Sequence, residues 1–101
     1  MKHLRILVYK NEDHLLAQCL EHDICTQDKK LEDLYLKMEL TLFLESESSS
    51  DKSLNHIPPA PAHFEEKWNS KYRTDLCQSF HYTQNYDLHY CYMNLSEYEE
   101  T

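Results

Sequence analysis

The fold is decided by residues 4–27, which read LRILVYKNEDHLLAQCLEHDICTQ. Leu4, Ile6 and Val8 recur at a period of two, and this alternation predicts a strand with one clearly apolar face. The rest of the fold can be built outward from this first strand.

A polar break over residues 10–14 separates the first strand from a second apolar run over residues 15–20. Because the break has the length of a hairpin connection, we expect the two strands to pair antiparallel. Residues 24–26 are the candidate for a short third strand. The chain has no glycine, so we expect Asn11 or Asp13 to take the left-handed conformation in the turn.

The hydrophobic period then changes to that of a helix. Apolar residues recur at spacings of three and four, the pattern of a helix that packs on a sheet: Leu31, Leu34, Tyr35, Met38 and Leu42. A second apolar set, Leu36, Leu40 and Phe43, falls on nearly the opposite side of this helix. Leaving these side chains in water would forgo about 1.5 to 3 kcal/mol each, so we expect a second subunit or the C-terminal segment to cover them.

The second half is harder to interpret. Residues 45–62 are rich in serine, proline and charge and predict an exposed linker. Residues 63–73 predict a short helix, and residues 80–82 and 88–95 are aromatic and β-prone. We therefore expect one domain over residues 1–101, with its core in residues 1–44 and a returning strand near the end.

Charge limits the classes of partner. Eighteen acidic residues against ten lysines and arginines give a net charge of -8. Residues 1–44 carry six basic and eight acidic groups, net -2, and residues 45–101 carry four and ten, net -6. Such a chain repels phosphate backbones, so we expect a basic protein partner and no direct nucleic-acid binding.

The N-terminus predicts a cytoplasmic protein. The apolar run over residues 6–9 is too short for a signal peptide or a membrane span. We therefore expect the four cysteines to be reduced thiols, since disulfides persist mainly in oxidising compartments: Cys19, Cys25, Cys77 and Cys91.

The sequence contains side chains that could bind a metal or act in catalysis, but they do not form a known metal-binding or catalytic motif. Cys19, His22 and Cys25 lie close together, and His81, His89 and Cys91 follow later, yet the close ligand pairs typical of zinc sites are absent. Four acids could cluster as in two-metal nucleases, although they also suit solvated turns: Asp13, Glu21, Asp23 and Asp28. We expect no enzyme activity, no catalytic residue, no metal and no cofactor.

The C-terminal aromatic residues favour packing or a protein interface. Among them are Tyr90 and Tyr92, and tyrosine is enriched in protein–protein interfaces. The expected partner or oligomer interface comprises Leu36, Leu40, Phe43, Tyr90 and Tyr92, with Glu21 and Asp23 as acidic groups facing the partner.

Residues 4–45 resemble the N-terminal domain of the HicB-family antitoxins. The resemblance rests on the strand over residues 6–9, the phrase Cys-Leu-Glu at 19–21, the Thr-Gln at 26–27, and the helix over residues 31–44. Asp28 stands where the family usually has glycine and Lys30 where it usually has a capping threonine, so we expect Asp28 to take over one or both of the two roles, the turn and the cap. Residues 54–101 match neither the helix-turn-helix domain nor the ribbon-helix-helix domain with which typical members of the family bind their operator DNA.

The resemblance implies a β-β-β-α-β fold of the partial RNase H type, in which a late strand over residues 82–95 returns to the sheet. We expect an α+β fold, with an antiparallel sheet of three to four strands packed on one main helix and a further short helix. It also implies an antitoxin-type protein that binds and occludes a small basic mRNA-cleaving toxin of the HicA type. The alternative is a solitary structural or regulatory domain without a toxin, and in both readings we expect a homo-oligomer.

Overall fold

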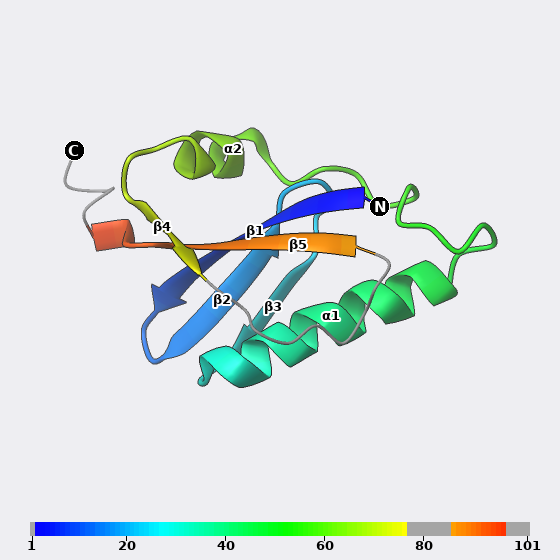
Figure 1. Ribbon diagram of the computed structural model, residues 1–101, viewed down its shortest axis with the longest axis horizontal. Coiled ribbons are helices and arrows are strands. Elements are labelled where there is room, and N and C mark those ends of the chain that lie inside the picture. The colour runs from blue at the N-terminus through cyan, green and yellow to red at the C-terminus, as the bar shows by residue number, and fades with distance from the viewer. Residues whose placement is uncertain (1, 77–85, 97–101) are drawn as a thin grey trace.

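The computed structural model describes residues 2–76 and 86–96. The elements in chain order are β1 (Lys2–Asn11), β2 (His14–Cys19), β3 (Cys25–Asp28), α1 (Leu31–Glu47), α2 (Ala62–Trp68), β4 (Arg73–Leu76) and β5 (Tyr86–Met93). Figure 1 shows the sheet between the two helices, with α1 on one side and α2 on the other. The expected α+β class is confirmed.

The sheet has five strands in the order β3-β2-β1-β5-β4. The hairpin of β1 and β2 pairs antiparallel as expected, from Ile6 opposite Cys19 to Asn11 opposite His14. The late strand does return to the sheet, but β5 lies parallel to β1, with Lys2 opposite Tyr86. The expectation of an antiparallel sheet with three to four strands is therefore wrong in these details. A long connection that contains both helices lets β5 enter in the same direction as β1.

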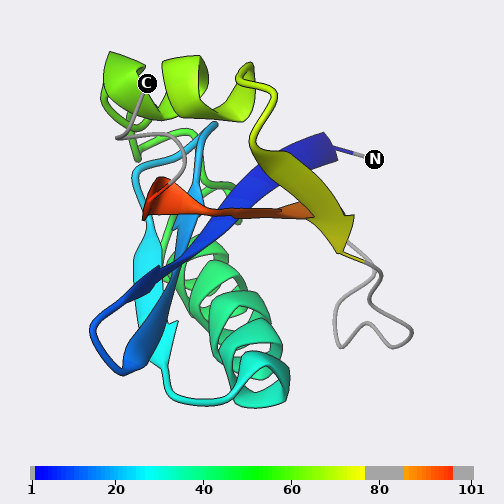
Figure 2. The same ribbon diagram turned by 90° about the vertical axis from the view of Figure 1, so that its left-hand side faces the viewer.

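The central strand β1 is buried on both faces, because α1 covers one side of the sheet and α2 the other. On the α1 face, Leu4, Ile6 and Val8 of β1 are fully buried in one core. On the α2 face, Leu7 is fully buried in a second, smaller core with Trp68. Figure 2 shows this arrangement of α1, sheet and α2 in three layers. Residues 4–8 are therefore almost continuously apolar, as is typical of a strand covered on both sides.

The start of α1 depends on Asp28. Its carboxylate accepts hydrogen bonds from the backbone N–H groups of Lys29, at 2.7 Å, and Lys30, at 3.3 Å. Lys30 occupies the N-cap position without a side-chain hydrogen bond. Asp28 therefore holds the turn before the helix, and the acids Glu32 and Asp33 oppose the partial positive charge of the helix N-terminus.

The segment between the helices is not an exposed linker. Leu54 is 1% exposed and belongs to the α1-side core, and Ile57 packs against that core. Pro58 accepts a backbone hydrogen bond from Asp23 at 2.7 Å, and Ala60 donates one to Leu20 at 3.0 Å. These contacts hold the segment against the turn between β2 and β3. The linker prediction was wrong because a few apolar residues and backbone hydrogen bonds are enough to anchor a segment of polar composition.

The hairpin turn differs from the expectation as well. Asn11 and His14 are the last paired residues of the hairpin, which leaves only Glu12 and Asp13 to make the turn. Glu12 takes the left-handed conformation with φ 57°, and so does Lys52 in the segment after α1. The prediction of Asn11 or Asp13 for this role was wrong, because the register of the two strands decides which residue must take the left-handed conformation.

Residues 63–73 divide between two elements. The short helix ends at Trp68, and residues from Arg73 onward form β4 on the free edge of β5. β5 covers most of the predicted strand over residues 88–95, and the strand predicted over residues 80–82 lies outside the described residues.

Candidate interaction surface

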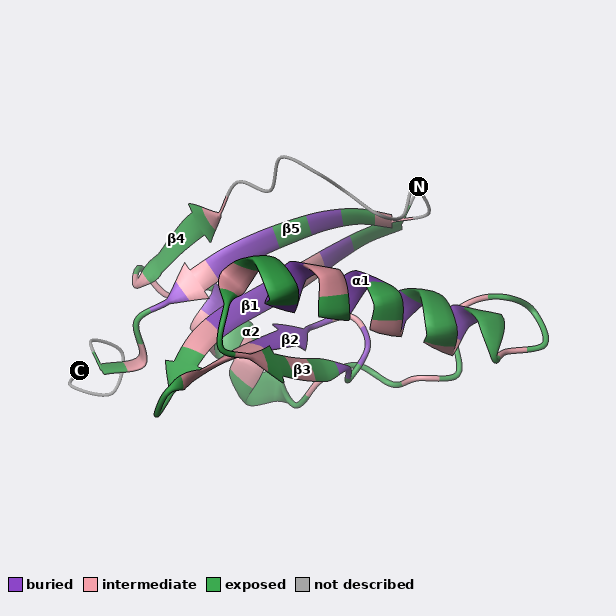
Figure 3. Ribbon diagram, turned by 90° about the horizontal axis from the view of Figure 1, so that it is seen from below, coloured by how far each residue is buried: buried purple, intermediate pink, exposed green. Residues whose placement is uncertain are grey.

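The outer face of α1 exposes three large apolar side chains. Leu40 is 49% exposed, Phe43 44% and Leu44 63%, while Leu36 is half-buried. The inner face of the same helix, including Leu34 and Met38, is fully buried against the sheet. Figure 3 shows α1 from outside, with exposed stretches along the side turned away from the sheet. The structure thus places Leu40 and Phe43 where a partner could cover them.

The same helix is acidic. Its residues 31–47 contain five acids, Glu32, Asp33, Glu39, Glu45 and Glu47, and one base, Lys37, a difference of -4. The Nζ of Lys37 forms an ion pair with Asp28 at 2.9 Å, so its charge is already balanced. Glu39 is buried and Glu47 is ion-paired with Lys52 at 3.1 Å, so Glu32, Asp33 and Glu45 supply the negative charge around the apolar residues of the outer face.

The two tyrosines expected at an interface lie on the core side instead. Tyr90 is 1% exposed, and its ring contacts that of Tyr35 edge to face, with centroids 4.6 Å apart. Tyr92 is half-buried against the same core. The expectation for Tyr90 needs correction, because its place on β5 points it at α1. Burial and the nearby Glu39 also raise the pKa of Tyr90 strongly.

Glu21 forms a structural ion pair. Its two carboxylate oxygens accept hydrogen bonds from the backbone N–H and the Nε of Arg5, both at 2.6 Å. The Arg5 guanidinium also binds Glu65 of α2 at 2.8 Å and keeps the pKa of that carboxyl below its usual range. Asp23 is exposed and accepts a hydrogen bond from Gln18 at 3.0 Å. Of the two acids expected to face a partner, Asp23 is the accessible one.

The four acids considered as a metal cluster are held by separate partners. Asp13 binds His14 at 2.8 Å, and Asp28 binds Lys37. Within residues 2–76 and 86–96, the one grouping of three metal-ligating side chains consists of other residues, Asp75, His89 and Cys91. The carboxylates of the first half thus stabilise turns and ion pairs.

The cysteines and histidines of residues 19–25 do not converge either. Cys19 is a buried core residue, and burial raises the pKa of its thiol to about 11. Cys25 is an exposed free thiol. The His22 ring is buried, and its Nδ1–H donates to the carbonyl of Ile57 at 2.8 Å. His81 lies outside the described residues.

Sequence reasoning noted His89 and Cys91 but missed Asp75. His89 and Cys91 are two residues apart on β5 and so share one face, a spacing that was visible in the sequence. Asp75 reaches them through β4, which the sequence pattern did not predict.

His22 makes the stability of the fold depend on pH. Burial lowers the pKa of His22, with Lys2 and His56 acting in the same direction and Glu21 and the Ile57 carbonyl against it. The unfolded chain therefore binds a proton more readily than the folded one. We expect the free energy of unfolding to fall as the pH is lowered below about 6.5, the usual value for histidine.

Urea denaturation at pH 7.5 and pH 5.2 measures this effect. His22→Gln should flatten the dependence, whereas His63→Gln, at an exposed histidine of α2, should preserve it. An unchanged pH dependence in His22→Gln would show that other groups cause it.

No helix among the described residues is both long enough and apolar enough to cross a membrane. Comparisons of the chain with models of protein families, with curated proteins and with solved structures find no match.

Proposed function

We propose that the chain is a protein-binding domain that docks a basic protein on the outer face of α1. One observation carries this proposal: Leu40, Phe43 and Leu44 are exposed at helical spacings of three and four residues on α1, which has five acids, one of them buried, and one base. Burying each large apolar side chain is worth about 1.5 to 3 kcal/mol, so a partner that covers them gains affinity.

Charge favours a basic partner over a second copy of the chain. Two copies would each bring a net charge of -8 to the contact and repel one another. A basic surface would instead be attracted, which raises the rate of association and favours the correct orientation. A second copy of the chain, bound through α1, is the competing occupant of this face.

The class of partner that we propose is a small basic RNA-cleaving protein in the cytosol. The resemblance of residues 4–45 to HicB-family antitoxins supports this class, as does the order of three strands, a helix and a late strand. The proposed mechanism is occlusion: the acidic domain occupies the basic surface with which the ribonuclease would bind RNA.

The test is to express the product of the reading frame adjacent to the gene for this chain, first alone and then together with this chain. We expect a small basic protein that arrests growth alone, and growth that resumes when this chain is present. The double variant Phe43→Gln/Leu44→Gln keeps the charge, and we expect it to weaken binding by at least about 10-fold, as the loss of two buried side chains implies. Calorimetry on the purified pair measures the affinity.

The matched control is Ser49→Gln/Ser50→Gln, which places the same amide side chains just beyond α1 and should bind as the unaltered chain does. Three outcomes would contradict the proposal: a neighbour that is not basic, growth arrest that persists, or binding that the α1 variant leaves unchanged. Dimers that the α1 variant dissociates would show that a second copy occupies the face.

A further inference from the structure

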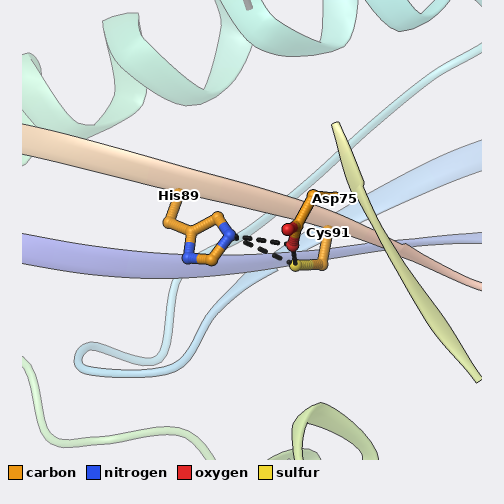
Figure 4. Close-up of side chains that lie close together, drawn as sticks. All are labelled: Asp75, His89 and Cys91. Atoms are coloured by element: carbon orange, nitrogen blue, oxygen red, sulfur yellow. Dashed lines mark hydrogen bonds and ion pairs between the residues drawn. The ribbon is translucent and has the colours of Figure 1, made fainter. Parts of the chain in front are cut away.

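Three side chains with different ligand atoms meet on the α2 side of β4 and β5. Asp75 lies directly opposite Cys91 in the antiparallel pair of these strands. His89 precedes Cys91 by two residues, so the strand places both on one face. Figure 4 shows the carboxylate, the imidazole and the thiol turned toward one another.

The distances within the cluster are short on all three sides. Oδ1 of Asp75 lies 3.0 Å from Nε2 of His89 and 3.0 Å from Sγ of Cys91. The third side, from Sγ of Cys91 to Nε2 of His89, measures 3.5 Å. Zinc bonds of about 2.0 to 2.3 Å in a tetrahedron separate neighbouring ligand atoms by about 3.3 to 3.8 Å. The cluster is therefore close to the size of one face of a zinc coordination tetrahedron.

The orientation of His89 distinguishes a ligand set from a catalytic relay. In a relay of nucleophile, histidine and carboxylate, the two ring nitrogens face different partners. Here the same nitrogen, Nε2, faces both Sγ and Oδ1. Three atoms that converge on one point, instead of forming a chain, match what a metal ion requires.

The surroundings suit a bound cation with an open coordination position. Cys91 is buried, whereas the side chains of Asp75 and His89 are 76% and 51% exposed, so the cluster opens to solvent on one side. The His89 ring packs edge-on against Trp68, with centroids 5.1 Å apart, which fixes its orientation. An Nη1 of Arg73 lies 3.5 Å from the sulfur, but burial and the Asp75 carboxylate raise the pKa of the Cys91 thiol to about 11, so a bound metal would have to displace the thiol proton.

We propose that Asp75, His89 and Cys91 bind a divalent transition-metal ion of the zinc type, with a fourth position left to water or to a partner side chain. The donor set selects this class of ion, because thiolate and imidazole suit zinc while magnesium and calcium take oxygen ligands. The ion would hold the edge strand β4 against β5. Its two positive charges would balance the Cys91 thiolate and the Asp75 carboxylate. This site is independent of the α1 face.

The experiment uses the full chain under reducing conditions, freed of metal, with Co²⁺ and then Zn²⁺ as probes. We expect Co²⁺ to produce a thiolate-to-cobalt charge-transfer band and Zn²⁺ to abolish that band at one ion per chain. Cys91→Ser should remove the band. Asp75→Asn changes a side chain that is 76% exposed, so we expect it to fold and to weaken Zn²⁺ binding at least about 10-fold.

Cys25→Ser is the matched control, because Cys25 is a free thiol outside the cluster, and it should leave the band unchanged. A thermal melt gives a second measurement: Zn²⁺ should raise the melting temperature of the unaltered chain and not that of Cys91→Ser. The proposal is overturned if the band is absent from the unaltered chain, or if it persists in Cys91→Ser.

Discussion

Replacing Trp68 by alanine is expected to lower the free energy of unfolding by about 3 to 5 kcal/mol. Trp68 is 5% exposed and is the buried residue of α2 in the smaller core, where it packs with Leu7. The guanidinium of Arg73 also lies 4.7 Å from the centre of its ring. Removing the indole would leave a cavity and detach α2 from the sheet, and urea denaturation measures the loss.

The matched control is Phe64→Ala, one turn earlier on the same helix. Phe64 is half-buried at the margin of the same core, so its loss should cost clearly less than that of Trp68. Equal effects of the two substitutions, or a loss below about 1 kcal/mol for Trp68→Ala, would be incompatible with a second core beneath α2.

Replacing Met38 by alanine is expected to destabilise the fold by about 2 to 5 kcal/mol. Met38 is fully buried in the α1-side core. The inner side of α1 therefore contributes to stability through packing, and denaturation of the isolated chain is the appropriate measurement.

Leu40 provides the comparison two residues further along the helix. It is 49% exposed, so Leu40→Ala should change the stability of the isolated chain by no more than about 0.5 kcal/mol. A large loss of stability for Leu40→Ala would mean that the outer face of α1 is already covered within the chain. The pair of variants thus separates the stabilising side of the helix from the side proposed to bind a partner.

The first half of the fold could be predicted from sequence because its signals are local. The alternation of Leu4, Ile6 and Val8 set the face of β1, and the helical spacing of Leu34 and Met38 set the face of α1. The same spacing identified Leu40 and Phe43 as an outer apolar set, which the structure leaves exposed.

The second half could not be predicted because long-range contacts determine it. β4 reads Arg-Thr-Asp-Leu, which has no strand pattern of its own, and it becomes a strand by pairing with β5. Leu54 is one apolar residue in a polar segment, yet it is buried in the core. The grouping of Asp75 with His89 and Cys91 depends on that strand register, so sequence spacing alone could not reveal it.

Methyl NMR of the chain with the basic partner that we propose tests the central claim most directly. Titration of the unlabelled product of the adjacent reading frame, which we propose is a small basic protein, should shift or broaden the methyl signals of Leu40 and Leu44. The signals of Leu34 and Leu42, fully buried on the inner side of α1, should change little. Perturbation confined to other parts of the sheet, with Leu40 and Leu44 unaffected at saturation, would contradict docking on the outer face of α1.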